Sequence, residues 1–147
     1  MKTVKAFAPA TVANVSCGFD ILGFAIEGMG DIVQLNEKEN PGLEVSSISG
    51  DDGKLPLDAA KNTCAVAIQA MVEDLGVNPG ISIQLEKGLP LGSGMGSSAA
   101  SAVAALVAAN EFLGSPYEKK DLLPFAIAAE KIACGAGHAD NVAPSLL

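Results

Sequence analysis

Arginine is absent from this 147-residue sequence, and all nine of its basic residues are lysines. The seventeen acidic residues bring the net charge to −8. Nucleic-acid binding needs a basic surface, so this balance argues against a DNA- or RNA-binding protein. Phosphates and carboxylates are most often bound by arginine. If this protein binds such groups, we expect lysines and a metal ion to meet them, or arginines on further chain.

Cysteine is also scarce and carries no metal-binding pattern. Cys17, Cys64 and Cys134 lie far apart and form no C-x-x-C pair, so a zinc site is not expected and reduced thiols are. No apolar run is long and continuous enough to span a membrane, and the N-terminus lacks the apolar core of a signal peptide. The expectation is a cytoplasmic protein with one well-buried domain, since 49% of its residues are hydrophobic.

Hydrophobic periodicity predicts an α+β chain. Alternating apolar residues predict strands at 3–9, 31–37, 43–49 and 81–87. Helical spacing predicts helices at 63–75, 99–112 and 122–133, the first with Asn62 as its N-cap. The middle of segment 9–25 and the segment 134–144 are rich in glycine, proline and small residues, which predicts loops.

A glycine-rich loop joins the strand at 81–87 to the helix at 99–112. This arrangement binds phosphate, because glycines let the backbone approach a ligand and the free N–H groups of the helix start point outward. We expect one of Ser97 and Ser98 to cap the helix and the other to ligate a metal on the phosphates. The spacing excludes the Walker loop and the G-x-G-x-x-G fingerprint. A flexible loop whose serines only cap the helix is the alternative.

The run Pro-Leu-Gly-Ser-Gly-Met-Gly-Ser-Ser-Ala-Ala at 90–100 resembles the P-x-x-x-G-L/M-G-S-S-A-A loop of the GHMP small-molecule kinases. The resemblance implies ATP as the phosphoryl donor. It also implies an N-terminal GHMP domain similar to domain 2 of ribosomal protein S5, with a mixed β-sheet, helices on one face and a left-handed βαβ crossover. Pattern alone would predict a right-handed one. The implied nucleotide contacts are Asn62, Lys87, Pro90, Leu91, Gly92, Ser93, Gly94, Met95, Gly96, Ser97 and Ser98.

The pattern P-A-T-x-A-N-x-x-x-G-F-D at 9–20 is similar to the signature of one branch of this family, the homoserine kinases. The resemblance implies that Asn14 and Asp20 bind the amino-acid substrate, although on composition alone a pair of Asx turns is favoured. The segment G-H-x-D-N-x-A-P at 137–144 is also similar to a motif of the branch. It implies that His138 contacts the substrate. Asn141 stands at the catalytic position where other GHMP kinases carry a proposed aspartate base.

Glu130 falls on the apolar face of the helix predicted at 122–133. A carboxylate there is costly unless it is paired or bound to a metal. An ion pair with Lys131 or another neighbour is the simplest account from the residues alone. The resemblance implies instead that Glu130 and Ser98 bind Mg²⁺, and carboxylate and hydroxyl oxygens suit that hard cation.

The implied function is ATP-dependent phosphorylation of the L-homoserine hydroxyl, in threonine biosynthesis. This chain would be the nucleotide-binding half, with residues 1–147 forming the N-terminal domain. The C-terminal GHMP domain would be absent from it, and it would be inactive alone. The alternatives are another GHMP kinase with a different alcohol substrate, or a non-catalytic nucleotide-binding fragment. The expected partners are homoserine and ATP, without nucleic acid or membrane; the oligomeric state stays open, a homodimer included.

Overall fold

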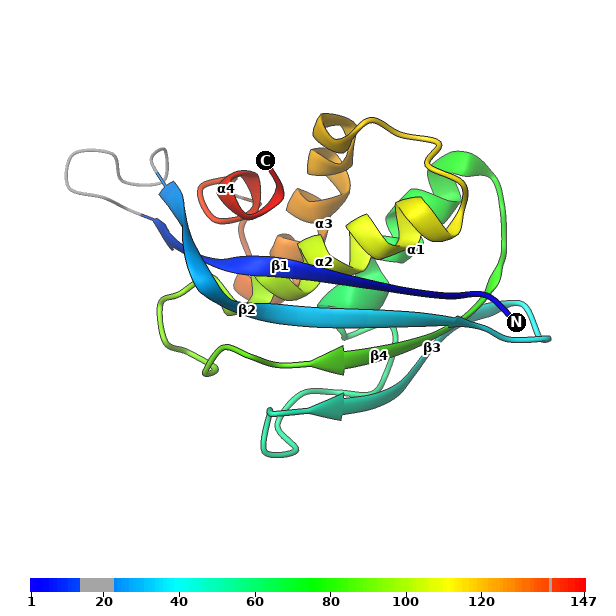
Figure 1. Ribbon diagram of the computed structural model, residues 1–147, viewed down its shortest axis with the longest axis horizontal. Coiled ribbons are helices and arrows are strands. Elements are labelled where there is room, and N and C mark those ends of the chain that lie inside the picture. The colour runs from blue at the N-terminus through cyan, green and yellow to red at the C-terminus, as the bar shows by residue number, and fades with distance from the viewer. Residues whose placement is uncertain (14–22, 138) are drawn as a thin grey trace.

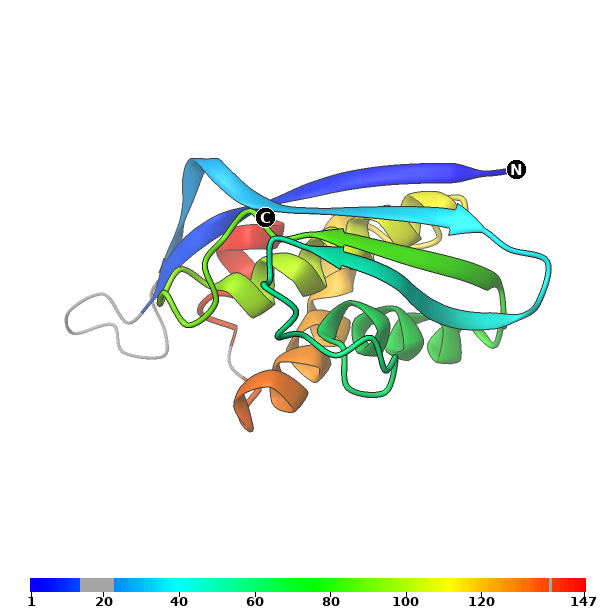
Figure 2. The ribbon, with the colours of Figure 1, turned by 90° about the horizontal axis from the view of Figure 1, so that it is seen from below.

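The computed structural model describes residues 1–13, 23–137 and 139–147. A mixed four-stranded sheet carries all the helices on one face, as Figures 1 and 2 show together. The strands are β1 (Thr3–Ala13), β2 (Gly23–Glu37), β3 (Gly42–Ser49) and β4 (Gly80–Glu86), in the order β1-β2-β4-β3. The helices are α1 (Thr63–Leu75), α2 (Ser97–Phe112), the 3₁₀ turn η2 (Lys119–Leu122), α3 (Leu123–Cys134) and α4 (Val142–Leu146). The expected α+β class is confirmed.

The connection from β3 through α1 to β4 sets the hand of the fold. β3 and β4 are parallel, whereas β1 with β2 and β2 with β4 are antiparallel. In Figure 1 both parallel strands run to the left, β4 lies above β3, and α1 lies behind the sheet. This crossover is left-handed, which the family resemblance implied and pattern alone did not.

Helix α2 forms the centre of the core. Eleven of its residues are buried, and most of them are alanines, so the sheet on one side and α1 and α3 on the other can all approach it closely. The inward positions of β2 and β4 alternate along each strand and supply Val33, Leu35, Ile81, Ile83 and Leu85. Across the described parts of the chain, no helix combines the length and apolar character needed to cross a bilayer.

The structure corrects the two ends of the chain. β1 continues to Ala13 and β2 begins at Gly23, whereas the predicted strands end at 9 and begin at 31. Residues 14–22, in the middle of the segment predicted as a loop, lie outside the described residues. The pairing shifts between Pro9 and Ala10, so that three residues of β2 bulge out between the pairs Pro9–Gly30 and Ala10–Ile26. Pro9 lies on the edge strand β1, and the bulge lies on the part of β2 beyond its pairing with β4, so proline and glycine are accommodated within the ladder although their local preference favours loops. The predicted loop near the C-terminus also contains α4.

Candidate active site

A cavity of about 560 Å³ lies between the glycine-rich loop, the start of α1 and helix α3. Eleven of the residues singled out from the sequence line it. Pro90 and Met95 belong to the same loop but are not among the lining residues. The three expected substrate contacts Asn14, Asp20 and His138 lie outside the described residues. The expected residues that line it are Asn62, Lys87, Leu91, Gly92, Ser93, Gly94, Gly96, Ser97, Ser98, Glu130 and Asn141.

The start of α2 is open toward a ligand. Its N-cap is Gly96, with φ of 67°, and no side chain of the described residues makes a capping hydrogen bond there. The expectation that one serine caps the helix is therefore wrong, because the chain enters the helix through a left-handed glycine. The uncapped amides and the positive end of the helix dipole favour an anion at this point.

The two serines of the first turn have different surroundings. Ser97 Oγ is buried and has no hydrogen-bond partner among the described residues. Ser98 Oγ donates to Glu130 Oε1 over 2.8 Å, and Glu130 is 7% exposed. A buried polar atom without a partner is costly, so a ligand that accepts a hydrogen bond from Ser97 Oγ would be favoured here. The structure also brings together the two residues expected to bind Mg²⁺.

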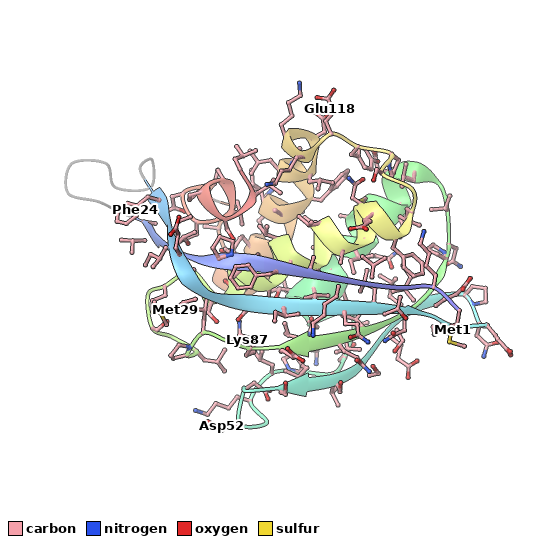
Figure 3. The ribbon with its side chains drawn as sticks, in the orientation of Figure 1. Met1, Phe24, Met29, Asp52, Lys87 and Glu118 are labelled. Atoms are coloured by element: carbon pink, nitrogen blue, oxygen red, sulfur yellow. The ribbon has the colours of Figure 1, made fainter. Side chains whose placement is uncertain are left out.

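A buried ion pair joins Lys87 to Asp31 at the base of the loop. Lys87 Nζ also donates to Ser97 O and Ser101 Oγ, each over 2.8 Å. Asp31 Oδ1 accepts from the backbone of Gly88 over 2.9 Å, and Asp31 Oδ2 accepts from Ser101 Oγ over 2.7 Å. The network therefore holds the first residues of the loop against the first turn of α2. Figure 3 labels Lys87 where β4 ends beside β2.

The network changes the role assigned to Lys87. The side chain is 1% exposed, and its three N–H donors already have three acceptors. The geometry therefore does not favour direct contact between Lys87 and a nucleotide phosphate. Lys87 instead positions the glycine-rich loop. Sequence analysis missed Asp31 and Ser101. Asp31 was detectable, since it shares the inward phase of β2 with Val33 and Leu35.

Asn62 caps α1 as expected. Its Oδ1 accepts from the amide of Cys64 over 3.0 Å, and its Nδ2 donates to Pro56 O over 3.0 Å. Asn62 still lines the cavity, so a contact with adenine stays a prediction. The neighbouring thiol is buried, which raises the pKa of Cys64 to about 12 and keeps it protonated.

Asn141 reaches the cavity from the N-terminus of α4. Its Oδ1 accepts from Thr11 Oγ1 over 2.7 Å. Thr11 belongs to the signature noted at residues 9–20, but sequence analysis assigned it no function. Of the described residues that line the cavity, Glu130 is the only carboxylate.

Comparison with known proteins places these features in one family. Residues 62–147 match the family described as the GHMP kinases N terminal domain. The homoserine kinase of Chlorobium phaeovibrioides is 55% identical over 100% of this chain and 49% of its own length. That of Xylella fastidiosa (strain M12) is 43% identical over 97% of this chain and 44% of its own length. The chain thus spans about half the length of these curated relatives.

Solved structures agree with the sequence matches. The crystal structure of homoserine kinase from Cytophaga hutchinsonii superimposes with a TM-score of 0.96 at 57% identity, covering 99% of this chain and 46% of that one. The Methanococcus jannaschii mevalonate kinase, at 17% identity and a TM-score of 0.74 over 99% of this chain and 50% of its own, shares the fold. The chain therefore belongs to the GHMP kinase family and has the fold of that family's N-terminal domain.

Proposed function

We propose that this chain is the nucleotide-binding half of a homoserine kinase, which transfers the γ-phosphate of ATP to the side-chain hydroxyl of L-homoserine. The choice of homoserine as substrate rests on the 55% identity to a homoserine kinase along the whole chain. Such a reaction belongs to threonine biosynthesis and to the cytoplasm.

The cavity suits a nucleoside triphosphate. Within residues 1–13, 23–137 and 139–147, no side chain caps the start of α2 and the buried Ser97 hydroxyl has no partner, so phosphate oxygens would satisfy both. Ser98 and Glu130 fit a magnesium ion, because they bring a hydroxyl and a carboxylate oxygen to one point in the cavity. When bound, Mg²⁺ would offset negative charge on the phosphate oxygens.

The acceptor hydroxyl would be aimed rather than strongly activated. Glu130 is the only carboxylate among the described lining residues, and in this proposal it serves the metal. Phosphoryl transfer depends mainly on positioning and on charge stabilisation, so a strong base is not required. Asn14, Asp20 and His138 would bind homoserine, and Asn141 would face the reacting groups.

The remaining half of the protein would complete the site. Relatives of about twice this length match the chain in their N-terminal portion, so we infer a C-terminal GHMP domain that follows it. That domain would supply the cationic groups for substrate that this arginine-free chain lacks.

The direct test is release of ADP by the full-length protein with Mg·ATP and L-homoserine. Strong homoserine-dependent release is the expected result. Mevalonate, galactose and other small alcohols serve as comparison acceptors at the same concentration. A folded, ATP-binding protein that phosphorylates one of these and not homoserine would overturn the choice of substrate and leave the nucleotide site standing.

A further inference from the structure

We propose that Thr11 is a positioning residue that holds the side-chain amide of Asn141 in one orientation, with its NH₂ group directed to the cavity. The proposal rests on the proposed function, since it concerns how the same site treats its acceptor. The proposal gives a role to Thr11, the threonine of the 9–20 signature. The orientation of the amide determines which chemistry Asn141 can perform.

Thr11 is fixed at two points. It is 0% exposed, and its backbone N donates to Met95 O in the glycine-rich loop over 2.9 Å. Its hydroxyl donates to Asn141 Oδ1 over 2.7 Å. A single residue of β1 therefore joins the phosphate loop to the N-terminus of α4.

Asn141 is held by its backbone as well. Its N–H donates to Asp140 Oδ1 over 3.1 Å, and its carbonyl accepts from Ser145 N over 3.2 Å. With the main chain fixed, rotation of the amide is the freedom that remains to this side chain. Oδ1 is occupied by Thr11, whereas Nδ2 donates to no described residue.

Gly96 closes the other side of the amide oxygen. A Cβ at this position would lie 2.1 Å from Thr11 Oγ1 and 2.9 Å from Asn141 Oδ1. The glycine is therefore required for close approach as well as for its positive φ. Its backbone packs against the oxygen, which leaves the N–H donors as the part of the amide available to a ligand.

The orientation has a chemical consequence. An N–H donor can stabilise negative charge that develops on the transferring phosphoryl group or on the acceptor oxygen. It cannot accept the proton of the acceptor hydroxyl. Thr11 thus makes Asn141 a donor and not a base, and without the Thr11 hydroxyl the amide can also present its oxygen to the acceptor.

The test uses Thr11→Val in the full-length protein, because valine keeps the shape and removes the hydroxyl. We expect kcat for homoserine phosphorylation to fall about tenfold or more while KM for ATP stays within about twofold. Thr11→Ser, which keeps the hydroxyl, should restore most of the lost turnover. Thr3→Val is the matched control: it removes a Thr Oγ1–Asn Oδ1 bond of 3.0 Å from the same strand at an exposed site.

A second measurement does not depend on the acceptor. In protein labelled with ¹⁵N-asparagine, the NH₂ pair of Asn141 should be distinct in the wild type and Thr11→Ser, and should broaden or shift in Thr11→Val. If the valine variant does not fold, Thr11→Ala replaces it in both measurements.

The outcomes separate this proposal from the proposed function. A Thr11→Val protein with the kcat of Thr3→Val, or an unchanged Asn141 amide signal, would overturn the positioning role. Absence of homoserine turnover in the wild type would overturn the proposed function instead, and the amide signal would then still decide the orientation.

Discussion

At the scale of single residues, the site depends on polar atoms that the chain by itself leaves incompletely satisfied. Ser97 Oγ is buried without a partner in the part of the chain that the structure describes, although burial of a hydroxyl without a hydrogen bond is unfavourable. Ser98 and Glu130 by contrast are joined in the cavity. A phosphate oxygen that accepts from Ser97 Oγ would satisfy this hydroxyl. A metal ion held by Ser98 and Glu130 would bind the same chain of phosphates.

Ser97→Ala should separate binding from stability. Removal of an unsatisfied buried hydroxyl is expected to leave the free energy of unfolding unchanged or to raise it by about 1 kcal/mol. Affinity for ATP should fall about tenfold, because a phosphate contact is lost. Thermal unfolding and nucleotide titration check the two effects, with the exposed Ser47→Ala as control. Unchanged ATP affinity would show that this hydroxyl serves no ligand.

Glu130→Gln tests whether the Glu130 carboxylate binds the metal ion. We expect turnover to fall about a hundredfold, the scale of one lost transition-state contact, and the Mg²⁺ concentration for half-maximal activity to rise. The matched control is Glu118→Gln, since Glu118 is exposed, pairs with Lys120 and points away from the rest of the molecule in Figure 3. A Mg²⁺ dependence equal to that of the control would remove Glu130 from the metal site.

At the scale of elements, the site is built on the unit from β4 through the loop to α2. The loop borders open space at Gly92 and Gly94, where an added Cβ would meet no described residue within 4 Å apart from its chain neighbours. Its base is held instead by Asp31 and Lys87, which contact Gly88 at one end and Ser97 at the other. The loop therefore has a fixed base, and its glycines leave the backbone open to the close approach of a ligand.

Lys87→Met should therefore destabilise the domain strongly. It leaves the Asp31 carboxylate, which is 0% exposed, without its cation, and such a loss typically costs about 3–5 kcal/mol. Lys5→Met is the matched control, because the Lys5–Glu86 pair at 3.8 Å is exposed and is worth about 1 kcal/mol or less. Urea unfolding of both variants measures the difference. Equal losses would mean that the buried network does not hold the loop.

At the scale of the whole molecule, the chain forms the cavity proposed to hold a nucleotide but lacks arginine entirely. The curated relatives are about twice as long, so their second half is available to complete the substrate site. The net charge of −8 disfavours the phosphate backbone of nucleic acids as a partner. This balance of charged residues allows small anionic ligands whose charge is offset by a bound metal ion.

Comparison of residues 1–147 with the full-length protein tests this division. We expect the shorter chain to bind ATP weakly and to release no ADP with homoserine, because substrate contacts are missing from it. Nucleotide titration at several salt concentrations and the ADP assay give the two readouts, with an RNA oligonucleotide as a control ligand. Turnover by residues 1–147 near that of the full protein would contradict the assignment of this chain as half of the site.

Local patterns were sufficient for much of the fold. The bounds of α1 agree with the prediction, and β3 and β4 begin one residue earlier than expected. These elements have regular periodicity and clear caps or turns, which depend on neighbours in sequence. The glycine-rich loop and the pairing of Ser98 with Glu130 were likewise anticipated, through a motif and a resemblance.

Long-range contacts decided the rest. The outer parts of β1 and β2 pair across a bulge, although proline and glycine there favour a loop locally. Asp31 and Thr11 are buried polar residues whose partners lie 56 and 130 positions away in the chain. By itself the sequence determined the α+β class and the glycine-rich loop between β4 and α2, since both follow from local spacing. Only the tertiary structure decided which side chains hold that loop and orient Asn141, because those contacts join segments that no local pattern relates.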